Sequence, residues 1–558
     1  MTIKTLLTSS IKMAASNVAV LLLAILSSAF TTTHGQILHN GRWKLLKRSI
    51  GISAMHVALL PNGKVIVFDR TDFGASNISL PSKRCRNDSR DQALRHDCWA
   101  HSVEFEPFGR SVRPLTVLTD TWCSAGALTA NGTLVQTGGF NDGERAVRYF
   151  SPCEGCDWVE DEEGLAVKRW YASAHVLPDG RRVVVVGGRG QFDYEFVPKE
   201  MSSGAASTFE LPFLRETKDA SENNLYPFVH LSPDGNLFIF ADTKAILLDY
   251  EHHRVVRRFP EMPGGISRNY PSTGSSVLLP ILLPHNVSGA IEAEVMICGG
   301  TMPNASSLAA KGHFVPASNT CGWLKITDES PAWTMEEMPM GRVMGDMVLL
   351  PTGDVLIVNG AGKGSAGWYM GREPVLHPVL YRSGVAGVAN QGFEVLSPTT
   401  TPRVYHSTAH LLPDGRVLVG GSNPNIKYEF SGVLFPTELS LEAFYPPYLG
   451  APRRPRITGM EPGTEITYGE MLSIEAQLEE GVGEVVVTMV APAFTTHSFS
   501  MNQRLLVLEV GGVRRSSGGC YMVEVMAPAS AVIAPRGYYM VFVVQEGVPS
   551  RGRWIHVM

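Results

Sequence analysis

The chain has 558 residues, a formal net charge of −5 and only 18% charged residues. This balance provides no basic surface for nucleic acid or for an anionic membrane, so neither is expected as a partner. With 55 Gly and 36 Pro, and few long amphipathic helical stretches, the composition predicts an all-β protein with many turns.

The first 35 residues have the features of a secretory signal peptide. Lys4 and Lys12 precede an apolar run at 18–26, and small residues follow it. The run is shorter than the roughly 20 apolar residues of a membrane-spanning helix, so we expect a secreted, extracellular protein. Five Asn-x-Ser/Thr sequons agree with export and are candidate N-glycosylation sites: Asn77, Asn87, Asn131, Asn286 and Asn304.

Eight cysteines in an exported chain predict disulfide bonds. Spacing suggests three local pairs, although it does not decide connectivity: Cys85 with Cys98, Cys153 with Cys156, and Cys298 with Cys321. Cys123 and Cys520 are left over.

A pattern of an apolar strand, a turn of the Pro-Asp-Gly type and a second apolar strand recurs between residues 56 and 421. Clear copies are HVALLPNGKVIVF from His56, AHVLPDGRRVVVVGG from Ala174 and AHLLPDGRVLVGG from Ala409, with others at 125, 228 and 347 and a longer-turned copy at 275. The clear turns are about 60 residues apart, near the ~50-residue period of kelch blades. The sequence therefore predicts a seven-bladed kelch-like β-propeller over residues 36–445.

Five of the hairpins have a chemically distinctive residue seven positions before the turn: Cys123, Tyr171, Tyr226, Met344 and His406. If the blades are equivalent, these residues start the inner strands and face the central axis. Residues that are far apart in sequence are thus predicted to converge on one point.

The Pro/Arg-rich stretch APRRPRI from Ala451 indicates a domain boundary. Beyond it lie strand-like segments with alternating or continuous apolar residues: EVVVTMV from Glu484, RLLVLEV from Arg504 and GYYMVFVV from Gly537. We expect an immunoglobulin-like (early-set) β-sandwich over residues 450–558.

Four separated segments carry candidate chemistry: TDTWCSAG from Thr119, RWYAS from Arg169, PRVYHSTAHLLPDGR from Pro402 and APAFTTHSFSMNQR from Ala491. Two histidines with two tyrosines suit Cu(II) better than Zn, Ca or Mg. Together the segments resemble the copper radical oxidases of the galactose oxidase family, in particular the plant-type glyoxal (aldehyde) oxidases. ENNLYPFVHLSPDGN, RNYPSTGSSVLLP and GREPVLHPVLY extend the resemblance over essentially the whole mature chain.

The resemblance implies one copper ion held by Tyr171, Tyr405, His406 and His497. It also implies a thioether between Cys123 and Tyr171 that forms a protein-derived radical cofactor, with Tyr405 as axial ligand and general base. Tyr405 and His406 are neighbours, so the backbone must bend for both to reach one ion. The implied reaction oxidises small aldehydes such as glyoxal and methylglyoxal to carboxylic acids and reduces O₂ to H₂O₂. A cell-wall or apoplastic location follows from the resemblance, and cell-wall polysaccharide is left open as a partner.

Two alternatives stay open. In galactose oxidase a Trp stacks over the cross-linked Tyr, but here the GG at 187–188 is followed by RGQ, which disfavours galactose. An oxidase of galactose or primary alcohols on cell-wall carbohydrate is the first alternative, and a non-catalytic extracellular propeller that binds glycan or protein is the second. Tyr226, Tyr270 and Met344 are candidates for the mouth of the site, and packing explains them equally well. Arg189 is a candidate for substrate contact, but a surface salt bridge is the preferred interpretation.

Overall fold

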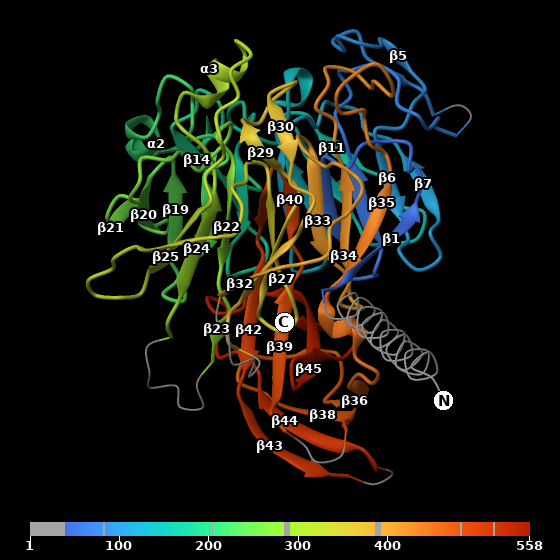
Figure 1. Cartoon of the computed structure of the whole chain (residues 1–558), viewed down its shortest axis with the longest axis vertical. Helices are drawn as coiled ribbons and strands as arrows, with labels where there is room; N and C mark the ends of the chain where they lie inside the picture. Colours follow the sequence, from blue (N-terminus) through green and yellow to red (C-terminus); the bar gives the residue numbers. More distant parts are fainter. Residues whose placement is uncertain are drawn as a thin grey trace, which may run out of the picture.

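The computed structural model describes residues 40–558 apart from 82–83, 200, 203–204, 284–290, 386–391, 480–482 and 517–518. The predicted signal peptide and the sequon at Asn286 lie outside these residues. A ring of sheets stands above a smaller β domain in Figure 1. Helices are short: η1 (Asn141–Gly143), α2 (Pro212–Glu216), α3 (Ala305–Ala309) and η2 (Pro447–Gly450). Across the described ranges, no helix has the length and apolar character to cross a membrane.

Seven groups of four hydrogen-bonded strands form the ring, which confirms the predicted seven-bladed propeller. Blade 1 consists of β2 (His56–Leu59), β3 (Val65–Phe68), β6 (Ser102–Phe105) and β7 (Val112–Leu115). Blade 2 consists of β8 (Ala125–Leu128), β9 (Leu134–Thr137), β10 (Val147–Phe150) and β11 (Val159–Asp161). Blade 3 consists of β12 (Ser173–Val176), β13 (Val183–Val186), β14 (Asp193–Val197) and β17 (Phe209–Glu210). Blade 4 consists of β18 (Phe228–Leu231), β19 (Leu237–Ala241), β20 (Lys244–Asp249) and β21 (Arg254–Arg258).

The remaining blades follow the same order from the inner to the outer strand. Blade 5 consists of β22 (Gly274–Leu278), β24 (Glu294–Gly299), β25 (Thr320–Lys325) and β26 (Thr334–Glu337). Blade 6 consists of β27 (Asp346–Leu349), β28 (Val355–Val358), β31 (Val379–Arg382) and β32 (Gly392–Val395). Blade 7 consists of β33 (Ser407–Leu411), β34 (Val417–Gly421), β35 (Leu441–Tyr445) and β1 (Arg42–Lys47). Short pairs lie outside the blades: β4 (Arg86–Asn87) with β5 (His96–Asp97), β15 (Met201–Ser202) with β16 (Ala205–Ala206), and β29 (Ala361–Gly364) with β30 (Gly371–Pro374).

Blade 7 closes the ring because it combines strands from both ends of the propeller sequence. The strand β1 pairs antiparallel with β35, which places Trp43 opposite Phe444. This pairing joins the two ends of the propeller sequence through backbone hydrogen bonds within one blade.

The burial and the turn geometry of the inner hairpins explain why the same sequence pattern repeats from blade to blade. All residues of β12 and β13 are buried, because inner strands pack against neighbouring blades on both faces. The turn between them needs Gly180: its φ is +66°, and a Cβ there would lie 2.5 Å from the carbonyl oxygen of Arg536.

Each of four blades also contains a buried arginine that holds the entry to its inner strand. The side chain of each donates a hydrogen bond to a backbone carbonyl at the end of the second strand of that blade: Arg169 to Gly187, Arg268 to Gly299, Arg342 to Asn359 and Arg403 to Gly421. All four arginines are at most 2% exposed. Each stands two residues before Tyr171, Tyr270, Met344 or Tyr405, so the sequence contains an Arg-x-Tyr/Met signature.

The C-terminal domain has two packed sheets, as an immunoglobulin-like sandwich requires. One sheet contains β23 (Ile281–Leu282), β42 (Arg504–Leu508), β39 (Val485–Ala491), β45 (Gly537–Gln545), β46 (Val548–Pro549), β47 (Arg553–Val557) and β37 (Glu465–Ile466). The other contains β36 (Arg456–Glu461), β38 (Met471–Gln477), β44 (Tyr521–Met526) and β43 (Val510–Arg515). The propeller strand β23 joins the first sheet parallel to β42, so the two domains share backbone hydrogen bonds.

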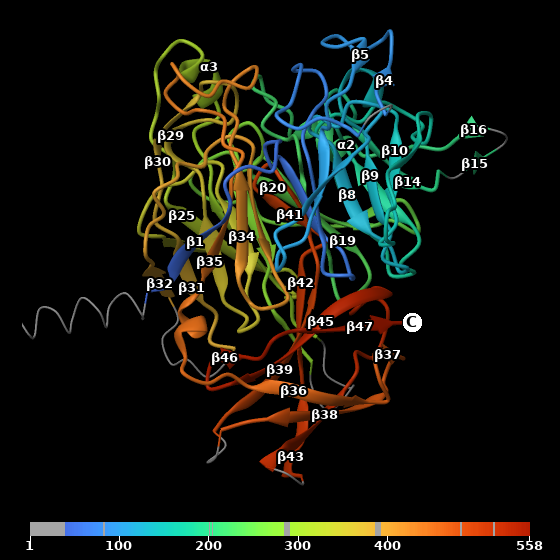
Figure 2. The same cartoon turned by 90° about the vertical axis from the view of Figure 1, so that its right-hand side faces the viewer.

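A hairpin of the C-terminal domain enters the centre of the propeller. It consists of β40 (Phe494–Thr496) and β41 (Phe499–Met501), and β40 pairs antiparallel with the innermost strand β2 of blade 1. Figures 1 and 2 show this hairpin rising from the lower domain into the ring. Its tip is formed by His497 and Ser498.

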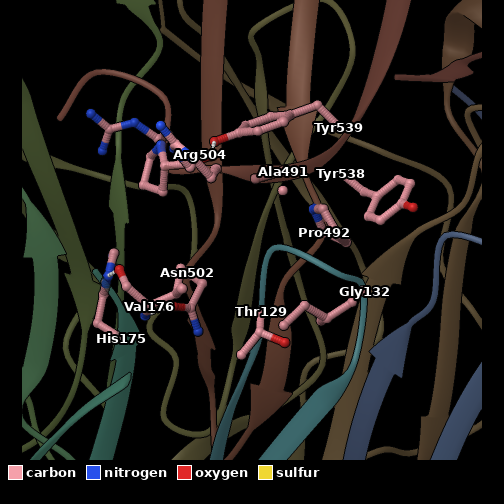
Figure 3. Close-up of a pocket in the computed structure, with 14 residues that line it drawn as sticks. Thr129, Gly132, His175, Val176, Ala491, Pro492, Asn502, Arg504, Tyr538 and Tyr539 are labelled. Carbon is pink, nitrogen blue, oxygen red and sulfur yellow. Dashed lines mark hydrogen bonds between the residues drawn. The ribbon is translucent and has the colours of Figure 1, made fainter. Parts of the chain in front are cut away.

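Three consecutive polar side chains fasten the base of the hairpin to different blades. Asn502 accepts a hydrogen bond from the Val176 N–H (2.7 Å) and donates one to the Gly126 carbonyl (3.0 Å). Gln503 bonds to Met347 and Leu349, and Arg504 to Leu231. A cavity of about 40 Å³ lies at this junction. Figure 3 shows Arg504 and Tyr539 on one side of it and His175, Val176 and Asn502 on the other. Its lining contains none of the predicted site residues.

We predict that Asn502→Ala lowers the free energy of unfolding by about 2–4 kcal/mol, because it leaves two buried backbone groups without partners. Chemical denaturation measures the change. Asn236→Ala is the matched control. Within the described residues, the Asn236 side chain bonds to Asp234 of its own turn, so this variant should change stability by about 0.5 kcal/mol or less. Equal stability of the two variants would show that Asn502 does not anchor the hairpin.

Candidate metal centre

His497 lies at the two-residue turn of the β40–β41 hairpin. Both turn residues have positive φ, +45° for His497 and +67° for Ser498, as a type I′ turn requires. Such turns favour Asn and Gly, so two other residues here indicate local strain that the surrounding structure maintains. The Thr496 hydroxyl lies 2.7 Å from His497 Nδ1, which leaves Nε2 for the site.

The five residues that precede the hairpin turns by seven positions share one backbone conformation. The φ values are +55° for Cys123, +64° for Tyr171, +50° for Tyr226, +60° for Met344 and +63° for His406. Left-handed backbone is rare for such residues, so the shared conformation confirms that the positions are equivalent. Hydrogen bonds from the Tyr171 N–H to the Cys123 carbonyl (3.0 Å) and from the Tyr226 N–H to the Tyr171 carbonyl (2.9 Å) link successive blades here.

The positive φ of His406 also provides the predicted bend after Tyr405. The two neighbouring rings stack with centroids 3.7 Å apart, instead of pointing to opposite faces as on an ideal strand. Both side chains therefore reach the same point.

The structure brings the five predicted site residues together, with the other four around His497. The sulfur of Cys123 lies 3.1 Å from His497 Nε2, and the ring centroids of His406 and His497 are 4.9 Å apart. The rings of Tyr405 and Tyr171 lie 5.7 and 6.1 Å from that of His497. One ligand atom each of Cys123, His406 and His497 fall within 4.8 Å of one another.

His406 is the clearest sign that the cluster accommodates a ligand. Its side chain is 3% exposed, and among the described residues neither ring nitrogen has a hydrogen-bond partner. Leaving a buried polar group unpaired is costly, and native proteins rarely do so without a ligand, ion or water. Imidazole nitrogens and phenolic oxygens are the donors that Cu(II) accepts in a tetragonal site, so these residues fit copper.

Without a metal ion, burial keeps the side chains of the site uncharged. It lowers the pKa of His497 to about 3 and that of His406 well below its usual range, so both rings are neutral near pH 7 and have a free lone pair. It also raises the pKa of Tyr171, Tyr405 and Cys123 well above their usual ranges. A cation among these groups would reverse the effect on the phenols, because opposite charge favours the phenolate.

Tyr270 lies directly at this cluster, although its sequence position left its role open. Its ring stacks on that of Tyr171 with centroids 4.5 Å apart and planes 27° apart. Its hydroxyl lies 3.1 Å from the Tyr171 hydroxyl and 3.0 Å from the Tyr405 hydroxyl. The Arg-x-Tyr signature shared with the blades of Tyr171 and Tyr405 was the signal that could have placed it there.

An aromatic wall surrounds one side of the site. Trp122 and Trp170 directly precede Cys123 and Tyr171, and Trp122 contacts both Trp170 and Trp368, with centroids 5.1 and 5.2 Å apart. The buried Arg70 guanidinium lies over Trp122 and Trp368, at 4.7 and 4.9 Å from their ring centroids. Sequence analysis missed this wall, because the four residues come from separate parts of the chain.

The other candidate residues lie as follows. The three expected disulfides are present, Cys85–Cys98, Cys153–Cys156 and Cys298–Cys321, and Cys520 is buried and unbonded. Arg189 forms a salt bridge with Glu222 (2.7 Å) and has 51% of its side chain exposed, as expected. Tyr226 packs against His497, with centroids 5.0 Å apart, and Met344 packs in the cluster that contains Tyr405.

Comparison with solved structures supports the fold. A structure described as a novel fungal alcohol oxidase of the AA5 family, in complex with copper, superposes with a TM-score of 0.68 over 93% of this chain and 99% of that chain, at 18% identity.

Comparison of sequences identifies the family. Residues 55–448 match the family described as glyoxal oxidase N-terminus, and residues 454–557 match the galactose oxidase-like early set domain. Aldehyde oxidase GLOX1 from Arabidopsis thaliana is 45% identical over 93% of this chain and 85% of its own length. Aldehyde oxidase GLOX from Vitis pseudoreticulata is 44% identical over 93% of this chain and 97% of its own length. A galactose oxidase from Gibberella zeae is 24% identical over 80% of this chain and 62% of its own length. The chain therefore belongs to the glyoxal oxidase family.

Proposed function

We propose that the protein is a copper-dependent oxidase that converts small aldehydes and water to carboxylic acids while O₂ is reduced to H₂O₂. The observation that carries the proposal is His406, a buried imidazole beside His497 and Tyr405 whose two nitrogens have no hydrogen-bond partner among the described residues. The aldehyde oxidase names of the plant relatives support this choice of substrate.

Tyr171, Tyr405, His406 and His497 would hold the copper ion. When bound, copper supplies positive charge that favours the phenolates, Lewis acidity toward a substrate oxygen, and an acceptor for one electron. The four candidate ligand residues are at most 6% exposed, so water has little access to them.

The protein groups would divide the remaining work. Tyr405 would take the proton from a hydroxyl of the aldehyde hydrate as general base at its phenolic oxygen. Tyr171, linked to Cys123 through a thioether, would be oxidised by one electron before the reaction and in that form would accept a hydrogen atom from the substrate carbon. The aromatic wall of Trp122, Trp170 and Trp368 would orient a small substrate and exclude water.

We also propose an exported, N-glycosylated protein with domains at 36–445 and 450–558. The two family matches and the two sets of sheets support this division. The four sequon asparagines in the described residues are all exposed, as glycan attachment requires: Asn77, Asn87, Asn131 and Asn304.

The substrate class is tested by measuring H₂O₂ release from copper-loaded protein with glyoxal, methylglyoxal, galactose and benzyl alcohol. We predict the highest kcat/KM with the aldehydes. Galactose or benzyl alcohol as the best substrate would favour the alcohol oxidase instead. No H₂O₂ from any compound, with copper bound, would favour a non-catalytic propeller.

The ligand set is tested by copper affinity. We predict that His497→Ala weakens copper binding at least about 100-fold, since loss of a mere outer-shell partner already costs 10–100-fold. Competition with a chelator measures the affinity. His252→Ala removes an exposed histidine of blade 4 and should leave the affinity unchanged. Wild-type affinity of His497→Ala would exclude the C-terminal hairpin from the metal centre.

The thioether is tested by peptide mass. Its formation removes two hydrogen atoms, from the Cys123 thiol and the Tyr171 ring, so the joined peptides should weigh less than the sum of the two by this amount. Cys123→Ala should abolish the linkage and reduce the aldehyde oxidation rate at least about tenfold, equivalent to about 1.4 kcal/mol in the barrier. Cys520→Ala, which removes the other unbonded cysteine, is the control and should retain both. Full activity of Cys123→Ala would refute the cross-linked cofactor.

A further inference from the structure

Tyr270 contacts both tyrosines to which the proposed function gives chemical roles. Its ring covers the ring of Tyr171, and its hydroxyl is within 3.1 Å of the hydroxyls of both Tyr171 and Tyr405. Tyr270 is partly exposed, whereas Tyr171 and Tyr405 are only 4% and 3% exposed. It therefore lies between the two reactive phenols and the solvent-accessible side of the site.

Blade 5 holds Tyr270 firmly in this position. Arg268, two residues earlier, is fully buried and donates hydrogen bonds to the Gly299 and Thr320 carbonyls. The Tyr270 N–H donates to the Leu225 carbonyl (3.2 Å), and the Asn269 side chain donates to the Tyr226 carbonyl (2.9 Å). The ring is thus fixed by backbone contacts with the neighbouring blade as well as by its own stacking.

The hydroxyl of Tyr270 suits a bridge between two phenols. A tyrosine hydroxyl has one donor hydrogen and lone pairs that accept, so it can donate to one phenolic oxygen while it accepts from the other. Packing alone requires only the ring, and a phenylalanine would serve equally well. The two short contacts of the hydroxyl therefore need a separate explanation.

We propose that Tyr270 is a positioning residue of the oxidase, with separate roles for its ring and its hydroxyl; this inference rests on the proposed function. The ring shields the face of Tyr171 and prolongs the lifetime of its oxidised form. The hydroxyl fixes the phenolic oxygens of Tyr171 and Tyr405 relative to each other, so that proton uptake by Tyr405 and hydrogen transfer to Tyr171 occur on one bound substrate. Tyr270 undergoes no net change in protons or electrons.

Two variants separate these roles. Tyr270→Phe keeps the ring and removes the hydroxyl, whereas Tyr270→Leu removes both. Tyr369→Phe is the matched control, because Tyr369 is an exposed tyrosine whose hydroxyl bonds to Glu429 instead of to a site residue. The copper-loaded proteins are oxidised with ferricyanide, the oxidant is removed, and the decay of the tyrosyl-radical absorption is followed. The kcat and KM for glyoxal, the copper content and the melting temperature are measured in parallel.

We expect Tyr270→Phe to keep the radical lifetime within about twofold and to lower kcat about tenfold with less than about threefold change in KM, since a hydrogen bond to a charged group is lost. Tyr270→Leu should also shorten the lifetime about tenfold, in line with the loss of an aromatic pair. Wild-type kcat in the Phe variant, or wild-type lifetime in the Leu variant, would overturn the proposal. Loss of copper or of the folded state in the Phe variant would overturn it too, because the residue would then be structural.

A copper-free measurement separates failure of this inference from failure of the proposed function. Tetranitromethane nitrates accessible tyrosines, and peptide mass spectrometry locates the products. In metal-free protein we expect little nitration of Tyr171 and Tyr405 in the wild type and at least about fivefold more in Tyr270→Leu, with Tyr369→Phe like the wild type. Equal nitration in all three would refute shielding by Tyr270, whether or not the protein oxidises aldehydes.

Discussion

The pairing of β40 with β2 in the centre of the propeller is the interaction on which the candidate site depends. It connects a strand of the C-terminal domain to the innermost strand of blade 1, and it carries His497 to a point that no blade supplies. The side chains of Asn502, Gln503 and Arg504 fasten the base of this hairpin to several blades. The strained turn at His497 and Ser498 persists because these contacts determine its position.

The propeller contributes its part through a repeated backbone geometry. A left-handed residue at the start of an inner strand directs its side chain toward the axis, and hydrogen bonds between successive blades hold that residue in place. The buried arginines of the Arg-x-Tyr/Met signature support the adjacent turns from within each blade. Equivalent positions in different blades therefore carry Cys, Tyr, Met or His on one scaffold, and the chemistry differs by substitution instead of by change of fold.

The electrostatics of the cluster explain how such a site is both stable and receptive to a cation. Burial favours neutral imidazoles and protonated phenols, so the groups coexist at close range without charge repulsion. The cost is the buried imidazole of His406, which has no hydrogen-bond partner in the part of the chain that the structure describes. A metal ion would satisfy that nitrogen and shift the phenols toward their charged forms, and this reciprocal effect links metal binding to the stability of the axis.

The sequence by itself determined the blade number and the sandwich domain, because hairpin turns and apolar strands are local patterns. The seven-residue offset repeats with them and predicted that Cys123, Tyr171 and His406 are equivalent, whereas Tyr405 and His497 became candidates only through the family resemblance. Cysteine spacing suggested the three local disulfides, and the tertiary structure decided their connectivity. The sequence also contained the Arg-x-Tyr signal of Tyr270, although the signal was recognisable only once the buried arginines had a role. The tertiary structure alone decided the tip of the β40–β41 hairpin, since His497 and Ser498 are not residues that favour a type I′ turn. It alone also assembled the aromatic wall of Trp122, Trp170 and Trp368 and placed Arg70 over it. Contacts between blades depend on ring closure and leave no periodic trace in the sequence.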